Sequence, residues 1–239
     1  MRGLALANYV LALPGAAAAL MIHEYFKASV SYRLGDPYPK LNGRLRFSPV
    51  SQLEPIGFLL MLLYGYGWGK PVNTSDTYYK DRRMGTIITY IIPSLINLLF
   101  AFVFFIILTA AKQFSYTTGY SLPLSSQGFA QGIQAVGASG YGVSGIFSAQ
   151  SALLFISGTV YQIMYIFTRC SLSVAFVNLI PIYPLDASAL LDYCLPPEFR
   201  YTFGQYKGIL VMILILLFMT GVINAIFDPA VTFFLRSVQ

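Results

Sequence analysis

Long hydrophobic stretches separated by polar segments form the main pattern of the chain. A helix needs ~20 predominantly apolar residues to cross the hydrocarbon core of a bilayer, and several stretches approach or exceed that length. We therefore predict an all-α polytopic membrane protein with about four spanning helices. The stretches 4–34, 84–111 and 151–186 form the predicted core, and 205–226 is the last helix, which we expect Asp228-Pro229 to break.

Two shorter segments need a different interpretation. Residues 55–67, PIGFLLMLLYGYG, are apolar but too short to span a bilayer comfortably, so we predict a re-entrant hairpin. Before them, Asn42-Gly43 is a turn signal, and the residues from Arg44 to Phe47 alternate between polar and apolar. That alternation predicts a short β-strand on the cytoplasmic side.

Composition agrees with a membrane protein. The 239 residues are 56% hydrophobic and 10% charged, with a mean hydropathy of +0.65, whereas soluble domains carry roughly 25% charged residues. No long polar segment is available for a second core, so we predict a single membrane domain over residues 1–239. In so apolar a chain, the net charge of +6 indicates orientation and lipid contact rather than nucleic-acid binding.

Lysine and arginine are unevenly distributed along the chain. Eight of the fifteen lie between positions 33 and 83, whereas residues 113–150 contain no charged residue. The positive-inside rule therefore places residues 35–83 in the cytoplasm and 113–150 in an outside loop. We expect an integral, multi-pass protein of the cell membrane.

A group of ionisable residues lies inside the first hydrophobic stretch. His23, the only histidine, is followed by Glu24 and Lys27 in the sequence HEYFK. Positions 23 and 27 share a helix face, and positions 24 and 27 can also meet. Each such group costs about 2.5–3.5 kcal/mol at membrane depth on insertion scales, which indicates a functional site. The alternative is that the three side chains snorkel to the headgroups, but the topology brings Asp186 to the same depth.

HEYFK and four later segments of the sequence occur in an order that can be compared with a known pattern. HExxH on a helix places two imidazoles on one face to bind zinc, with the glutamate as general base. Here HEYFK is followed, in order, by LGDPYPKLNGRLRFSP, GWGKPV, DRRMGTIITYIIPSLINLLFAF and NLIPIYPLD. This combination resembles the site-2 protease family of intramembrane zinc metalloproteases, in particular its small bacterial-type members. The similarity covers roughly residues 15–105 and 160–195.

The resemblance implies a metal site and a general base. His23 and Asp186 fall on two zinc ligands of the family, Glu24 falls on the general base, and zinc is the expected cofactor. Lys27 stands at the position of the remaining ligand, a histidine.

The resemblance also implies residues that hold a substrate. Asn97 and Asn178 fall on asparagines that the family associates with an extended substrate. An unwound substrate segment would add to the edge of the predicted strand, which comprises Arg44, Leu45, Arg46 and Phe47. Transmembrane or membrane-anchored proteins are therefore the expected partners, together with lipid.

Most departures from the family pattern lie at or near the residues that the resemblance implies in metal binding and catalysis. A charged lysine has three donors and no acceptor, so Lys27 cannot replace a ligand histidine without losing its proton. Without zinc, Glu24 and Asp186 would be two buried anions, which is costly. We hypothesise that the Lys27 ammonium bridges them in place of a metal that is absent here, and that a protonated His23 supplies a second positive charge. Other departures lie at Phe26, Gln52, Glu54, Pro93-Ser94 and Ala187.

Three functions are compatible with this pattern. The favoured one is a pseudoprotease that binds membrane-anchored clients without cutting them. The first alternative is an active intramembrane zinc metalloprotease with an atypical site, in which His23 and Asp186 are joined by deprotonated Lys27 or by Glu24. The second alternative is a proton or ion pathway. Cleavage of a membrane peptide that depends on Glu24 would favour the protease, and a proton flux would favour the pathway.

Overall fold

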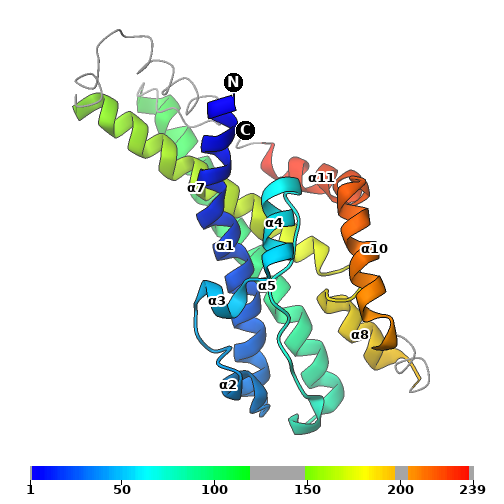
Figure 1. Cartoon of the computed structure of the whole chain (residues 1–239). Helices are drawn as coiled ribbons and strands as arrows, with labels where there is room; N and C mark the ends of the chain where they lie inside the picture. Colours follow the sequence, from blue (N-terminus) through cyan, green and yellow to red (C-terminus); the bar gives the residue numbers. More distant parts are fainter. Residues whose placement is uncertain (1, 119–148, 197–203, 237–239) are drawn as a thin grey trace.

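The computed structural model describes residues 2–118, 149–196 and 204–236, and these residues are predominantly helical (Figure 1). The elements, in order, are α1 (Arg2–Arg33), α2 (Tyr38–Leu41), α3 (Pro49–Gln52), α4 (Pro55–Tyr64), the 3-10 helix η1 (Asp76–Tyr78), α5 (Arg82–Thr118), α7 (Ala149–Val177), α8 (Asp186–Cys194), α10 (Lys207–Met219) and α11 (Val222–Leu235). The loop predicted at 113–150 lies largely outside the described residues.

Three long helices, α1, α5 and α7, pack against one another and form the centre of the molecule (Figure 1). Small residues on α1 allow its backbone to approach α7 closely, as is common between membrane helices. A Cβ added to Gly15 would lie only 3.0 Å from the backbone nitrogen of Phe167. Ala16, Ala19 and Leu20 continue this contact as part of a buried apolar cluster.

Among the described residues, two helices are long and apolar enough to cross a membrane, over Arg82–Gln113 and Thr159–Val177. A third span arises if α10 and α11, which are bent by 61° relative to each other, are taken together. The prediction of a helical membrane protein is confirmed, whereas the count of four spans is not. α1 is not one of these helices, and it carries the charged residues described below.

The break in the last hydrophobic stretch is not where the sequence predicted it. Pro229 lies inside α11, and the helix is interrupted instead at Gly221, which has a left-handed φ of +75°. The polar side chains of α11 hold it against the rest of the chain. Asn224 donates to the carbonyl of Tyr64 (2.9 Å), and Asp228 accepts a hydrogen bond from the Tyr66 hydroxyl (2.8 Å).

The segment 55–67 forms a helix and an extended return. α4 occupies its first ten residues, and the chain then runs back beside the helix to an isolated antiparallel bridge between Leu53 and Gly69. Trp68 packs with α10 through Phe218, at 5.9 Å between ring centroids. The shape is that of a hairpin, and its depth in a bilayer stays a prediction.

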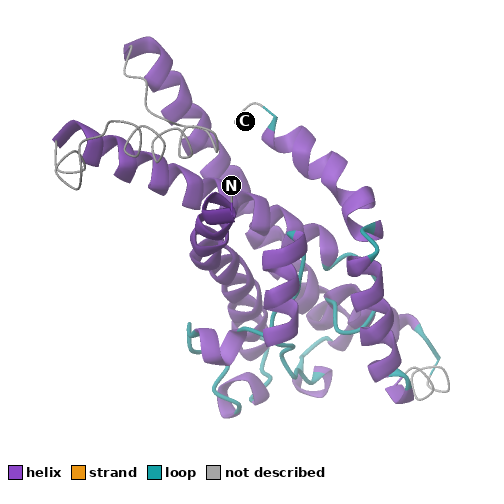
Figure 2. Cartoon of the chain, turned by 45° about the horizontal axis from the view of Figure 1, so that its top comes forward, coloured by secondary structure: helices purple, strands orange, loops and turns teal. Residues whose placement is uncertain are grey.

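The prediction of a strand over Arg44 to Phe47 is wrong. These residues form turns and a bend, and no described segment is a strand (Figure 2). Side chains satisfy the backbone here in place of a neighbouring strand. The Gln52 amide donates to the carbonyls of Arg44 (2.6 Å) and Arg46 (2.9 Å), so those acceptors are not available to pair with an added chain.

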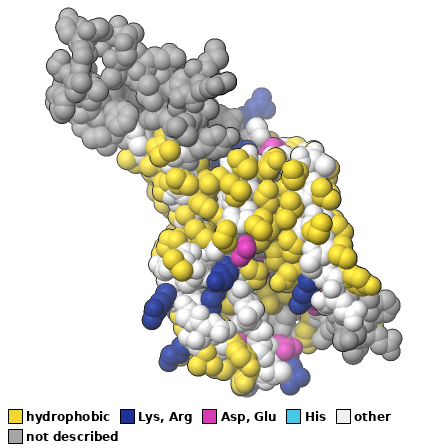
Figure 3. Space-filling view, in the orientation of Figure 1, with side chains coloured by type: hydrophobic (Ala, Val, Ile, Leu, Met, Phe, Trp, Pro, Cys, Tyr) yellow, Lys and Arg dark blue, Asp and Glu magenta, His cyan; other side chains and the backbone are white. Residues whose placement is uncertain are grey.

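Basic side chains gather on one part of the visible face. In Figure 3, hydrophobic side chains cover the middle of this face, and several lysine and arginine side chains lie toward the end at which α2 lies. The chain from position 33 to position 83, which includes α2, contains eight of the fifteen lysine and arginine residues, and we call this end the basic end.

Candidate functional site

Three side chains of α1 form one wall of a buried polar cluster. His23, Glu24 and Lys27 are 1%, 3% and 3% exposed, so they do not snorkel to the surface as the alternative interpretation required. Because they lie within little more than one helical turn, the helix itself brings the Lys27 ammonium to the Glu24 carboxylate, with 2.9 Å between Nζ and Oε2.

Asp186 closes the cluster from the opposite side, at the first residue of α8. The loop that carries it is tied to the end of α7 through Asn178. The Asn178 side-chain oxygen accepts a hydrogen bond from the Asp186 backbone N–H (3.3 Å), and the Asn178 backbone carbonyl accepts one from the Ala187 backbone N–H (3.0 Å). The Asn178 side-chain nitrogen donates to Val174 (2.8 Å). Asn178 therefore holds the aspartate in place.

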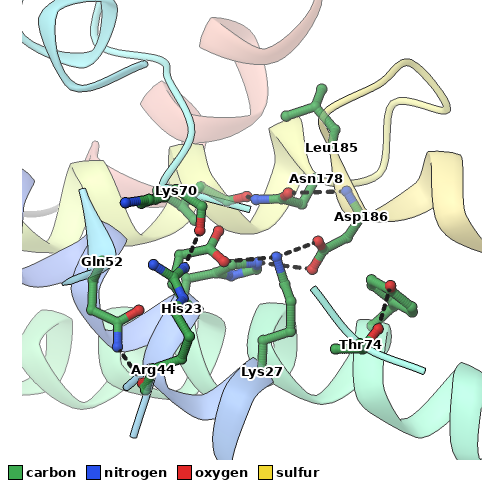
Figure 4. Close-up of polar contacts among 12 residues, drawn as sticks. His23, Lys27, Arg44, Gln52, Lys70, Thr74, Asn178, Leu185 and Asp186 are labelled. Atoms are coloured by element: carbon green, nitrogen blue, oxygen red, sulfur yellow. Dashed lines mark hydrogen bonds and ion pairs between the residues drawn. The ribbon is translucent and has the colours of Figure 1, made fainter. Parts of the chain in front are cut away.

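The Lys27 ammonium contacts both carboxylates, and Figure 4 shows it facing Asp186. Its nitrogen is 2.9 Å from Glu24 Oε2 and 2.6 Å from Asp186 Oδ1. The other oxygen of Asp186 is 2.9 Å from His23 Nε2. One carboxylate thus joins the lysine and the histidine, and both of its oxygens are occupied within the chain.

Asn97, on α5, completes the histidine's surroundings. Its side-chain nitrogen lies 3.3 Å from His23 Nδ1, and Asn97 is fully buried. A donation from the Asn97 amide to Nδ1 is compatible with the imidazole tautomer that carries its proton on Nε2, and this tautomer donates to Asp186. The two asparagines singled out by resemblance therefore lie beside the charged cluster, one contacting its histidine and the other fixing its aspartate.

The sequence did not predict the residues that surround Glu24. Gly69 lies so close that a Cβ there would come within 2.4 Å of Glu24 Cγ. Lys70 donates its backbone N–H to the carbonyl of Gln52 (2.8 Å), and the Arg44 guanidinium donates to the carbonyl of Lys70. The spacing of three glycines in GYGWG is the sequence signal for this close approach.

Arg44 brings a second cation to the neighbourhood of Glu24. Burial lowers the pKa of Arg44, and the negative charge of Glu24 opposes that shift. Lys27 and Arg44 together supply two positive charges beside the two carboxylates of Glu24 and Asp186. Of the predicted edge residues, Arg44 alone is buried; Leu45 is half-buried, and Arg46 and Phe47 are exposed.

A cavity of about 250 Å³ opens beside the cluster. Lys27 and Asp186 form part of its wall, so the otherwise buried charges face this space. The rest of the lining comes from the segment 71–74, Tyr90, residues 183–185, Ser188, Ala189, Asp192 and Lys207. A ligand that reached the charged cluster would pass between the segment 71–74 and α8.

Comparison with known proteins identifies the family. The profile of Peptidase family M50 matches residues 58–221, more than half of the chain. The chain belongs to this family, and the predicted resemblance to the site-2 proteases is confirmed. "Putative zinc metalloprotease YwhC" of Bacillus subtilis (strain 168) is 26% identical over 199 residues, which cover 83% of this chain and 75% of that protein. No solved structure gives a significant match.

Zinc is the metal expected in this family, and the side chains present do not fit it. A catalytic zinc site uses three protein ligands. Two of the implied ligands, His23 and Asp186, contact each other, and Asp186 also pairs with Lys27. The third position presents an ammonium, which has no lone pair. Within the described part of the chain, no group of three or more His, Cys, Asp or Glu side chains is placed to hold a metal ion.

Proposed function

We propose that this member of Peptidase family M50 is a pseudoprotease, which binds membrane-anchored clients through the peptidase scaffold without hydrolysing them. The position of the Lys27 ammonium between Glu24 and Asp186 is the observation that carries the proposal. It places an internal cation where the resemblance implies a ligand histidine.

The contacts of Glu24 support the same conclusion. A general base must accept a proton from water, and its carboxylate needs to be free to do so. Here one Glu24 oxygen is held by Lys27 at 2.9 Å and the side chain packs against Gly69. The Lys27 ammonium occupies a carboxylate oxygen that a general base would use to accept the proton, so this arrangement opposes the role implied for Glu24.

The cavity beside the cluster supports a binding role. It is lined by the segment 71–74 and residues of α8, which supply hydroxyl and charged groups as well as apolar side chains. We propose that an unwound part of a transmembrane client enters here. Asn97 and Asn178 act in this account as positioning residues, because their side chains contact His23 and the Asp186 backbone.

The proposal includes a placement in the cell membrane. The spans of α5, α7 and the bent pair α10 and α11 would cross the bilayer together with α1, which gives a multi-pass protein. The basic end, residues 35–83, would face the cytoplasm.

A cleavage assay tests the proposal. The purified protein is incubated, with added zinc, with a synthetic transmembrane peptide whose centre contains helix-breaking residues. We expect no cleavage by the wild type or by Glu24→Gln. A photo-crosslinker placed at Thr74, in the cavity wall, is expected to capture the peptide, whereas one placed at the exposed Lys80 is not.

Two results would contradict the proposal in different ways. Cleavage by the wild type that is abolished in Glu24→Gln would establish an active protease with an atypical site. Equal crosslinking at Thr74 and Lys80, without cleavage, would remove the client-binding role.

A further inference from the structure

An amphiphilic projection lies at the basic end of the molecule, apart from the charged cluster. It carries three large apolar side chains within ten residues: Leu41 is 76% exposed, Phe47 is 56% exposed and Val50 is 87% exposed. We refer to these three residues, with Arg33, Lys40 and Arg46, as the α2–α3 tip. Single exposed apolar side chains are ordinary, but a group of them marks an interaction surface.

The α2–α3 tip is held rigidly on the core. Gln52, which is fully buried, donates to the carbonyls of Arg44 and Arg46 on either side of Leu45. The Ser51 hydroxyl donates to the carbonyls of Arg46 (3.0 Å) and Ser48 (2.9 Å). The apolar side chains are therefore presented to the outside by a structured turn.

The exposed charge on the tip is positive. Arg33, Lys40 and Arg46 are exposed, and the Lys40 ammonium lies over the Tyr32 ring at 5.7 Å from its centroid. Of the acidic residues between positions 33 and 56, Asp36 is buried and Glu54 is half-buried. Apolar side chains flanked by exposed cations match an anionic lipid surface, where the cations meet the headgroups and the apolar side chains meet the acyl chains.

The adjoining helix supports the same assignment. α4 begins five residues after Val50, and Ile56, Leu59 and Leu63 are exposed along one of its faces. This apolar face continues the exposed surface of the tip along a helix that we expect inside the membrane. Leu41, Phe47 and Val50 then lie where headgroups give way to acyl chains.

We propose that the α2–α3 tip docks into the headgroup layer of an anionic bilayer, with Phe47 and Val50 inserted and Lys40 and Arg46 paired with lipid headgroups. This contact would also stabilise the position of Arg44 and Gln52, which are hydrogen-bonded to each other and contact the segment beside Glu24. The assignment does not depend on whether the protein cleaves its clients.

Depth-dependent fluorescence quenching tests this proposal. Val50→Cys, in a Cys194→Ser background, is labelled with an environment-sensitive fluorophore; Cys170 is buried and serves as an internal unlabelled thiol. The protein is reconstituted into phosphatidylcholine vesicles with and without phosphatidylglycerol, and nitroxide lipids act as quenchers. We expect quenching at position 50 that increases with phosphatidylglycerol, and little quenching at the exposed polar position Thr77→Cys.

Charge reversal provides the matched control. Lys40→Glu with Arg46→Glu should leave the fold intact, because both side chains are exposed, and should remove the dependence on phosphatidylglycerol. Absence of quenching at position 50 in both vesicles would overturn the proposal. Quenching at position 50 that decreases as the protein-to-lipid ratio rises, and does not depend on lipid composition, would also overturn the proposal. It would assign the tip to contact with a second copy of the chain.

Discussion

Two buried carboxylate sites near the end of α1 are stabilised in different ways. Asp36 is fully buried, and it accepts hydrogen bonds from the Ser31 hydroxyl (2.8 Å) and from the backbone nitrogens of Tyr38 (3.0 Å) and Ser75 (2.8 Å). All three donors are neutral. Among the described residues, Asp36 forms no ion pair.

The charged cluster contains two carboxylates, and it needs cations. Glu24 and Asp186 are held by one ammonium, and the Arg44 guanidinium is close enough to interact with Glu24 electrostatically. A single buried carboxylate can be stabilised by oriented dipoles, but two within reach of one side chain repel each other. The comparison indicates that the positive charge at position 27 is required by the anions around it.

The largest expected effect is that of Lys27→Met. Removal of one partner of a buried ion pair leaves an uncompensated charge, which costs about 3–5 kcal/mol. We expect a loss of this size in the free energy of unfolding, measured by denaturation in detergent micelles. The exposed Lys80→Met should change it by less than about 0.5 kcal/mol.

A compensating variant separates charge from packing. Glu24→Gln removes one of the two anions, so in the Lys27→Met background it should recover part of the lost stability. If Lys27→Met were as stable as the wild type, or if Glu24→Gln made it worse, the account of the cluster as a balance of charges would be wrong.

Asp36→Asn is expected to have a smaller effect, of about 1–3 kcal/mol. The asparagine keeps one acceptor oxygen and replaces the other with an amide nitrogen. In the wild type that second oxygen accepts hydrogen bonds, so in the variant its donors lose their acceptor. Thermal unfolding in the same micelles measures the loss. A cost equal to that of Lys27→Met would contradict the distinction between the two sites, because no cation depends on Asp36.

Gly69→Ala should have the smallest effect of the three, about 1–2 kcal/mol, typical of modest overpacking. Its Cβ would lie 2.4 Å from Glu24 Cγ and 3.1 Å from the Gln52 carbonyl oxygen, so Glu24 must move away from Lys27. Gly208→Ala is the matched control, since a Cβ there meets nothing within 4 Å. Equal stability of the two variants would show that Gly69 does not constrain Glu24.

Much of the fold could be predicted from local pattern. The apolar stretches predict α1, α5 and α7, and the spacing of Glu24 and Lys27 predicts their contact within one helix. The contact between Lys27 and Asp186 joins residues far apart in the chain, and its prediction depended on topology and on the family resemblance. The structure also offers Arg44 as a further cation beside Glu24, and the protonated His23 that the sequence led us to expect stays a prediction.

Two predictions failed for different physical reasons. Alternation over Arg44 to Phe47 is typical of a strand, but the Gln52 side chain binds the carbonyls of Arg44 and Arg46, which a strand would use. Pro229 is typical of a helix breaker, yet it lies inside α11, and the chain bends instead between α10 and α11, where Gly221 has a left-handed φ. Periodicity reveals neither the side-chain hydrogen bonds of Gln52 nor the backbone conformation of Gly221.

Metal content tests the central claim most directly. Wild-type protein and Lys27→His are purified without chelators, supplied with zinc, desalted and measured by elemental analysis and by thermal unfolding. The account predicts far less than one zinc per chain in the wild type, and close to one in Lys27→His, whose stability should rise with zinc. One zinc per chain in the wild type, lost in His23→Ala and Asp186→Ala, would contradict it.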